Sequence, residues 1–550
     1  MIGVIAGEDE AQAVEEFFQL FKTPWEFFRE GKSYNVVISS KNQSPALDAK
    51  IVFVYNSDFG PIDSRHGLSL AGLFNNRFVD FDGAKVPIYG RLLTFGGEFH
   101  SLLTVVDTSE VAGLEINIAE RKILRFGYDL FQEVALLLSS GQPKENALIP
   151  TLDLHISMIR SWIVKADIPL IEIPPAPPGY DFISCLTHDV DFFRIRDHKF
   201  DHTMWGFLYR STIGSLLEFL RRRISCKSLY RNWKAAISLP FVYLGLTQDF
   251  WLPFERYLEI EKDLPATFFL IPFKHRMGDK LNRSFYRKRA TRYDITDMPE
   301  WIKILSEHGK EIAVHGIDAW HSFEKGSEEL SRVAEICGDT ELGVRIHWLC
   351  FDRSSFQALE KAGFRYDSTF GYNDAIGYRA GTTQVFRPIG INHLLELPLM
   401  IQDTAMFYPR EMGLSKRRAW RLCKMLLKNS KRNGGVLTVL WHERSLAPER
   451  LWGDFYLRLL YELKGSRSWF GTAGQVIHWF QKRRNVLFKA ASFAGNILYL
   501  ELDCADSGDS SDLVLRVHVP RSYNDTASIA KPGYIDILLN DQKKLEISLV

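Results

Sequence analysis

FISCLTHDVDFF, residues 182 to 193, is the stretch that decides the fold. It opens with a short apolar run, residues 182–186, which is typical of a buried strand, and then places His188, Asp189 and Asp191 within four residues. Ionisable side chains at the end of an apolar strand are costly unless something pairs them. Because side chains i and i+2 of a strand point the same way, both aspartates would face one pocket. A metal ion, a basic partner or solvent are the candidates for holding them there.

Strands and helices alternate in the chain that follows. Apolar runs predict strands at 266–273, 311–315, 343–349 and 436–442. Helical patterns ending at or near a glycine lie between several of them, at PEWIKILSEH, SSFQALEKAG and KRRAWRLCKMLLKNSKR. This alternation predicts a parallel sheet or barrel.

Titratable side chains fall at the ends of these predicted strands. Besides the two aspartates, His315, His347 and His442 each close an apolar run. The C-terminal ends of all strands of a parallel α/β barrel lie on one face, and that face holds the active site. We therefore expect these side chains to lie close together.

Two of the strand ends carry further candidates for chemistry. Imidazole and carboxylate are donors that zinc accepts, so His315 is a candidate ligand, with His321 and Asp318 as candidates from the loop after it. A lone histidine is more often structural, and the spacing from His315 to His321 is not a standard helical one. Arg345 could pair with a carboxylate and lower its pKa, or lie on the surface.

The sequence divides into four segments. Residues 1–170 predict an N-terminal α/β domain of unknown role, and the proline-rich residues 171–181 predict a stiff linker. Residues 182–484 hold the alternating pattern. Residues 485–550 hold short alternating strands, which predict a small β-sandwich-like domain.

The charge, the cysteines and the lengths of the apolar runs argue against several classes of protein. The net charge of +1 over 550 residues gives no overall attraction to nucleic acid, and six scattered cysteines without a CxxC pair suggest no disulfide framework. No secretion signal and no apolar run long enough to span a membrane are evident, so we expect a cytoplasmic protein. The basic stretches 221–234 and 416–432 are typical of solvated helix faces; peripheral contact with an anionic substrate or a membrane surface is the alternative.

Taken in order, LTHDVD, ATFFL, EIAVHGIDAWH, VRIHWL and VLTVLWH resemble the motifs of the polysaccharide deacetylases of carbohydrate esterase family four. The resemblance covers roughly residues 180–480. It implies an α/β fold, an irregular (β/α)7-type deacetylase barrel, between an N-terminal α/β domain and a small C-terminal β domain. It also implies a hydrolase that removes N-acetyl groups from an amino-sugar-containing saccharide or glycan precursor. Such a hydrolase would use a divalent metal ion, and zinc is the one we expect.

The resemblance implies a role for each matching residue. Asp189 would be the catalytic base, Arg345 would orient it, and His442 would be the general acid. The metal ligands would be Asp191, His315 and His321. We further expect contacts with the saccharide from three side chains: Trp320, His347 and Trp441.

The motifs depart from the usual pattern in three places. The two aspartates are separated by one residue, His321 arrives two positions late, and Ile346, His347 and Trp348 replace the residues that usually follow the arginine. The remaining ligand therefore stays open between His321, Asp318 and His347. An inactive glycan-binding protein on the same fold, and a metal amidohydrolase acting on a non-sugar amide, are the alternative functions.

Overall fold

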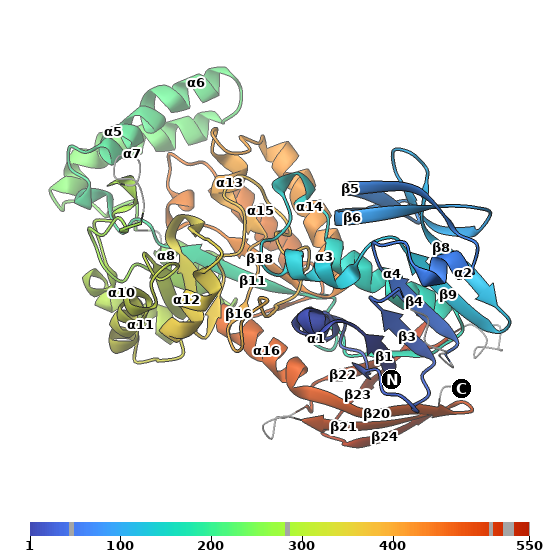
Figure 1. Cartoon of the computed structure of the whole chain (residues 1–550). Helices are drawn as coiled ribbons and strands as arrows, with labels where there is room; N and C mark the ends of the chain where they lie inside the picture. The colour runs from blue at the N-terminus through green and yellow to red at the C-terminus, as the bar shows by residue number, and fades with distance from the viewer. Residues whose placement is uncertain (43–48, 253, 281–286, 505–509, 521–532, 549–550) are drawn as a thin grey trace. The chain divides into compact units, whose positions relative to one another are not determined.

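The computed structural model describes residues 1–42, 49–252, 254–280, 287–504, 510–520 and 533–548, and the chain divides into two compact units (Figure 1). Unit 1 combines three segments: Met1–Gly179, Ala380–Gly390 and His478–Val550. Unit 2 combines Tyr180–Arg379 and Ile391–Ile477.

A curled sheet of parallel strands forms the centre of unit 2. Its order is β16-β15-β14-β13-β12-β11-β18-β17, and β19 is attached to β11. The strands follow one another around the curl in chain order, and no pairing between β16 and β17 closes it among the described residues. The α/β fold with a parallel barrel-like sheet is thus confirmed, with eight strands on the path where about seven were implied. The strands are β11 (Phe182–Asp189), β12 (Thr267–Leu270), β13 (Glu311–Gly316), β14 (Val344–Ile346), β15 (Tyr366–Asp367), β16 (Leu395–Glu396), β17 (Ile401–Gln402), β18 (Val436–Leu440) and β19 (Ser468–Phe470).

Helices link the strands of unit 2, and nearly every strand residue is buried as a result. Ser415 caps helix α14, its side chain accepting a hydrogen bond from the backbone of Arg418, and Gly434 ends that helix in a left-handed conformation. The helices between and after the strands are α10 (Pro299–Glu307), α11 (Phe323–Cys337), α12 (Ser355–Ala362), α13 (Asp403–Phe407), α14 (Lys416–Asn433) and α15 (Gly453–Lys464).

A helical insertion separates β11 from β12. It contains α5 (His202–Tyr209), a π-helical turn η4 (Arg210–Gly214), α6 (Ser215–Leu220), α7 (Cys226–Tyr243) and α8 (Phe254–Ile260). Asp201 caps α5, since its carboxylate accepts from the backbone N–H groups of Thr203 and Met204. Within the described ranges, every helix of the protein is too short or too polar to cross a lipid bilayer.

Unit 1 contains a nine-stranded mixed sheet of order β2-β1-β3-β4-β9-β8-β6-β5-β7. Its parallel half and its antiparallel half meet at β9, which pairs parallel with β4 and antiparallel with β8. The strands are β1 (Ile2–Ile5), β2 (Trp25–Phe27), β3 (Val36–Ser39), β4 (Ile51–Tyr55), β5 (Ser69–Phe81), β6 (Ala84–Gly96), β7 (His100–Val105), β8 (Val111–Ile118) and β9 (Arg121–Phe126). Its helices are α1 (Ala11–Phe21), α2 (Pro61–Arg65), α3 (Leu130–Leu137) and α4 (Thr151–Lys165).

Two small sheets hold the C-terminal residues of unit 1. One joins β20 (Val486–Ala494), β21 (Ile497–Cys504) and β24 (Lys544–Ser548); the other joins β22 (Val514–His518), β23 (Tyr534–Leu538) and β10 (Leu170–Glu172). Helix α16 (Ala473–Asn485) leads into them.

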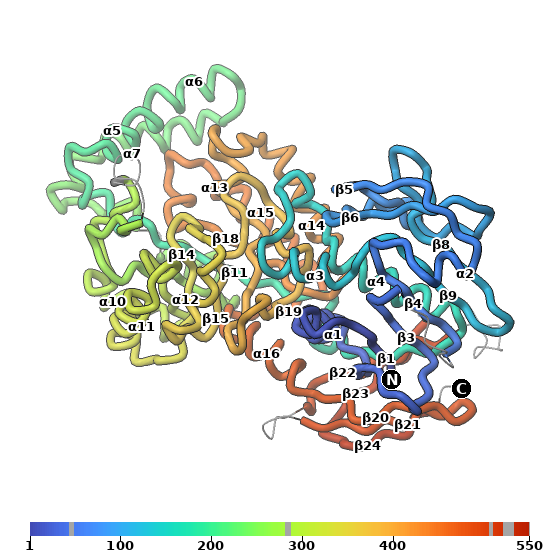
Figure 2. Tube along the Cα trace, viewed as in Figure 1, coloured from blue at the N-terminus to red at the C-terminus, as the bar shows by residue number. Residues whose placement is uncertain are grey.

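Segments from the N-terminal and C-terminal parts of the chain meet in unit 1 (Figure 2). Strand β10 pairs antiparallel with β22, and Glu172 lies 2.7 Å from Nε2 of His518. The buried guanidinium of Arg483 donates to the carbonyls of Gln19 and Leu20. The N-terminal and C-terminal segments that the sequence separates as two domains therefore lie in one compact unit.

Candidate active site

A cavity of about 690 Å³ opens at the C-terminal ends of the strands of unit 2. The polar side chains at strand ends that the sequence predicts to gather do line it: Asp189, Asp191, His315, His347 and His442. Aromatic side chains complete much of the wall, among them Phe192, Trp320, Trp348, Phe351 and Tyr408. The cavity is of the size that binds small organic ligands.

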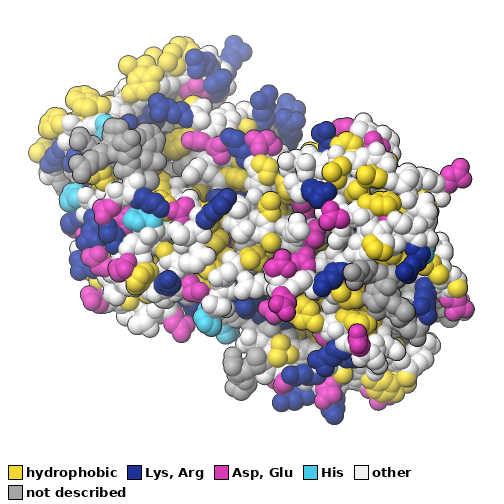
Figure 3. Space-filling view, in the orientation of Figure 1, with side chains coloured by type: hydrophobic (Ala, Val, Ile, Leu, Met, Phe, Trp, Pro, Cys, Tyr) yellow, Lys and Arg dark blue, Asp and Glu magenta, His cyan; other side chains and the backbone are white. Residues whose placement is uncertain are grey.

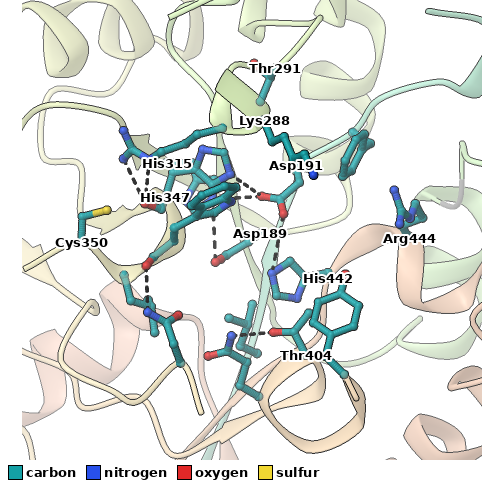
Figure 4. Close-up of a pocket in the computed structure, with 18 of the residues that line it drawn as sticks. Asp189, Asp191, Lys288, Thr291, His315, His347, Cys350, Thr404, His442 and Arg444 are labelled. Carbon is teal, nitrogen blue, oxygen red and sulfur yellow. Dashed lines mark hydrogen bonds and ion pairs between the residues drawn. The ribbon is translucent and has the colours of Figure 1, made fainter. Parts of the chain in front are cut away.

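Three side chains converge on one point of this cavity. Oδ1 of Asp191 lies 3.3 Å from Nε2 of His315 and 3.4 Å from Nε2 of His347. One ligand atom from each of the three residues lies within 4.8 Å of the others. Figure 4 shows the two imidazoles directed at the Asp191 carboxylate. We call Asp191, His315 and His347 the ligand triad.

A backbone carbonyl orients His315 of the triad, and burial acts on His347. Nδ1 of His315 lies 2.9 Å from the carbonyl oxygen of Arg345, which can only accept, so Nδ1 donates to it and Nε2 is the nitrogen that faces Asp191. Burial lowers the pKa of His347 well below its usual range, and the Asp191 carboxylate opposes that shift without reversing it. Trp348 follows His347 in the left-handed backbone region, with a φ of 64°, and turns the chain sharply there. Both rings thus direct Nε2 at the Asp191 carboxylate.

Asp191 stays ionised in this setting. Burial alone would raise its pKa, but the histidines that surround it, with the positive charge of His442 among them, hold the pKa of Asp191 well below the ordinary value. Its backbone N–H donates to Oε2 of Glu443 over 3.0 Å. Burial, together with the carboxylate of Asp191, raises the pKa of Glu443 to about 8.

Asp189 lies beside the triad and is paired with Arg345. Nη1 of Arg345 donates to Oδ1 of Asp189 over 2.9 Å, and both side chains are buried. The same nitrogen donates to Oγ1 of Thr187 over 2.8 Å, while Nε and Nη2 donate to the carbonyl and hydroxyl oxygens of Ser368. Oδ2 of Asp189 lies 3.8 Å from Nε2 of His315. A fixed, charged partner therefore aims this carboxylate at the triad.

His442 approaches the triad from another strand. Its Nε2 lies 3.9 Å from Oδ2 of Asp191 (Figure 4). Its Nδ1 lies 2.7 Å from Oδ1 of Asp403. Burial would lower the pKa of His442, but the Asp403 carboxylate outweighs this and raises the pKa of His442 well above its usual range. The protonated ring then turns one N–H toward Asp403 and the other toward the cavity.

Two side chains expected at the site lie elsewhere. His321 does not join the triad: its Nε2 lies 3.0 Å from Oδ1 of Asp318, because the loop after β13 turns back on itself there. His347, expected as a substrate contact, is in the position expected for His321. Trp441 is fully buried and stacks on Tyr456 with ring centroids 5.0 Å apart, because neighbours along an extended chain point to opposite sides. Trp320 does line the cavity.

Two acidic residues at the site escaped the sequence analysis. Asp403 follows β17, a strand of only two residues, and the one signal was an acidic residue after the apolar run LPLMI. Glu443 follows His442 directly, and its bond to the backbone of Asp191 depends on the fold, so nothing in the sequence marks it.

The chemistry of the donor set fits a divalent metal ion. Two imidazole nitrogens and one carboxylate oxygen form a set typical of catalytic zinc sites, which keep further positions open. The protonated His442 and the paired Asp189 lie next to the triad without belonging to it.

The fold of the chain is similar to those of several solved structures. Over 56% of its length it matches 95% of a putative polysaccharide deacetylase from Mycobacterium smegmatis at 19% identity, with a TM-score of 0.36. Over 56% it also matches 93% of Puue allantoinase at 14% identity (TM-score 0.34) and 70% of a CE4-family pseudoenzyme from Bacillus anthracis at 12% identity (TM-score 0.24). No family model and no curated protein matches the sequence. At these identities the likeness concerns the fold alone.

Proposed function

We propose that this protein is a metal-dependent hydrolase that removes N-acetyl groups from an amino-sugar-containing saccharide or glycan precursor. One observation supports this above the others. A carboxylate and a histidine, Asp189 and His442, flank the ligand triad in one cavity, and each is held by a buried partner of opposite charge. Hydrolysis of an amide needs a base for the attacking water and an acid for the departing amine.

The ligand triad would hold the metal ion. When bound, a divalent ion of the zinc type supplies a Lewis acid that polarises the amide carbonyl and acidifies a water molecule. Two imidazoles and one carboxylate leave room around such an ion for both.

Asp189 is the base in this proposal. Its carboxylate takes a proton from the water, and the donation from Nη1 of Arg345 fixes its orientation. Arg345 does not face the substrate in this scheme; it positions Asp189 through the bonds to Thr187 and Ser368 that hold its own guanidinium.

His442 is the acid. Its Nδ1 is committed to Asp403, so Nε2 is the nitrogen that can give a proton to the amine as the C–N bond breaks. The aromatic wall of the cavity, with Trp320, Trp348 and Tyr408, offers apolar faces on which sugar rings could lie.

The test is acetate release from N-acetylglucosamine oligomers by the full chain, with bound metal measured in parallel. Wild type should release acetate and lose that activity on treatment with a chelator. Asp189→Asn should abolish turnover while bound metal stays near the wild-type level. Asp454→Asn, a change of an exposed carboxylate at the start of α15, is the matched control and should be fully active.

Three other outcomes would contradict the proposal. Full activity in Asp189→Asn would remove its base. Metal binding with no acetate released from any acetylated saccharide, but with hydrolysis of a non-sugar amide, would replace the substrate class. Binding of the oligomers without turnover would indicate a glycan-binding protein.

A further inference from the structure

A helical arm extends from unit 2 between β11 and β12. It comprises residues 200–246, with α5, η4 and α6 as one limb and α7 as the other. The limbs pack against each other, and their facing sides bury Met204 and Phe207 against Ala235, Leu239 and Val242. This packing anchors the arm and accounts for one face of each limb.

The outer faces of the arm are also apolar, and nothing in the described chain covers them. Thirteen of the 27 large hydrophobic side chains that are exposed in the described residues lie between Phe200 and Leu246. Figure 3 shows hydrophobic side chains gathered over these helices, at the upper left, with Lys and Arg beside them. Exposed apolar patches of this extent mark binding surfaces.

Helix α7 shows how the two faces differ. The side chains of Tyr230, Trp233, Ile237 and Phe241 recur every three or four residues, and 43–71% of each is exposed. Three of the four buried residues of α7, Asn232, Ala235 and Leu239, lie two positions after an exposed one, which is about 200° around a helix. The helix therefore has apolar stripes on opposite sides, of which the core covers one.

The other limb carries a matching stripe. Trp205, Tyr209, Ile213, Leu216 and Leu220 recur every three or four residues through α5, η4 and α6, and all are exposed. Stripes that combine tryptophan and tyrosine with aliphatic residues are typical of helices that lie at a membrane surface.

Basic side chains accompany both stripes. Between His202 and Gln248 the chain has seven lysines and arginines and one acidic residue, Glu218, which is paired with Arg221 and Arg223. Arg221, Arg222 and Arg223 form the exposed tip of the arm where its limbs join. A second copy of this surface would bring like charges together, whereas an anionic surface would complement them.

We propose that the helical arm docks this protein onto an anionic lipid bilayer, with its exposed apolar side chains in the headgroup boundary and the arginines of the tip against lipid phosphates. His202, the first residue of α5, lines the active-site cavity. Docking through the arm thus holds that cavity beside the lipid surface. The inference rests on the arm alone and stands whether or not the cavity hydrolyses an amide.

Vesicle flotation of the full chain tests the docking. Wild type should bind phosphatidylcholine vesicles that contain phosphatidylglycerol, and added salt should weaken that binding. The triple change Arg221→Gln, Arg222→Gln and Arg223→Gln, and separately Trp233→Glu with Ile237→Glu, should each weaken binding at least about tenfold. Both sets replace exposed side chains, so their thermal unfolding should match wild type.

Tyr461→Glu is the matched control, because Tyr461 is 82% exposed on α15, outside the arm, and its replacement should leave binding unchanged. Three results would overturn the proposal: no binding of wild type to the anionic vesicles, equal binding by the arm variants, or a wild-type dimer in sedimentation that the arm variants convert to monomer without any vesicle binding. The last would assign the arm to a second copy of this chain.

Discussion

The carboxylate of Asp403 holds His442 twice: Oδ1 lies 2.7 Å from the ring Nδ1, and Oδ2 accepts the backbone N–H of the same residue over 2.8 Å. The sheet sets this relationship, because β17 and β18 are parallel neighbours in which Gln402 lies opposite Leu440. Asp403 is the first residue after Gln402, and His442 is the second residue after Leu440. The register of two strands therefore determines which nitrogen of His442 faces the cavity.

Replacing Asp403 with asparagine should slow catalysis without loss of metal. The amide removes the negative charge that raises the pKa of His442, so less of the ring is protonated at neutral pH. We expect kcat for acetate release to fall on the order of 10²-fold. We also expect the alkaline limit of activity, where the acid loses its proton, to move to lower pH. A pH–rate profile with metal analysis of the same samples checks this. Asp454→Asn again serves as control, and an unchanged profile in Asp403→Asn would refute the role of Asp403.

Metal content should depend on His347 and not on His321. His347→Ala removes one nitrogen from the ligand triad, whereas His321→Ala removes a ring that is paired with Asp318. Elemental analysis after dialysis against zinc should show near-stoichiometric metal in wild type and His321→Ala, and at least about tenfold weaker binding in His347→Ala. The reverse pattern would place the metal in the loop after β13.

Loss of the Arg345 guanidinium should destabilise the protein severely. Arg345→Met leaves the buried Asp189 carboxylate without its charged partner and removes the donors to Thr187 and Ser368. We expect a cost of about 3–5 kcal/mol in the free energy of unfolding, from urea titration followed by tryptophan fluorescence.

Lys303→Met is the control for that measurement. Lys303 is 78% exposed and 3.9 Å from Glu307, one turn away on α10, so its loss should change stability by less than about 0.5 kcal/mol. Similar costs for the two variants would show that the buried pair adds nothing specific.

Glu329 should make stability fall as pH rises. It is buried on α11 and accepts the backbone N–H groups of Ile317 and Asp318, and burial raises its pKa from 4.5 to about 7. The folded state therefore binds more protons than the unfolded state between these values, and the group stabilises the fold less at pH 8 than at pH 4 by roughly 3 kcal/mol.

Glu329→Gln isolates this contribution because its side chain does not titrate. The difference in unfolding free energy between wild type and the variant should move in favour of the variant as pH rises from about 4.5 to 7, and should be flat above that window. A difference that does not change with pH would show that Glu329 is ionised throughout.

The sequence was sufficient to predict the site residues that follow long apolar strands. Asp189, Asp191, His315 and His442 each follow such a run, and the geometry of parallel strands brings their ends together, so they share one cavity. Asp403 could not be predicted in this way, because the strand before it, β17, has only two residues and therefore shows no alternating pattern in the sequence.

Side-chain positions that depend on a loop, or on the alternating direction of side chains along a strand, were harder to predict from the sequence. His321 and His347 differ in where the chain turns after β13 and β14, which motif spacing does not specify. Trp441 and His442 are adjacent, but one is in the core and the other in the cavity. The pairing of β10 with β22 joins residues more than 340 positions apart, and only the folded chain shows it.

The three-segment composition of unit 1 has a consequence for synthesis on the ribosome. Asp153 accepts hydrogen bonds from Thr382 and Thr383, and the carbonyls of Gln19 and Leu20 receive the guanidinium of Arg483. These donors emerge hundreds of residues after their acceptors. The first 179 residues therefore lack some of their hydrogen-bond partners until the whole of unit 2 has been translated. The last residue of unit 2 is synthesised before the last segment of unit 1, so unit 2 is complete first.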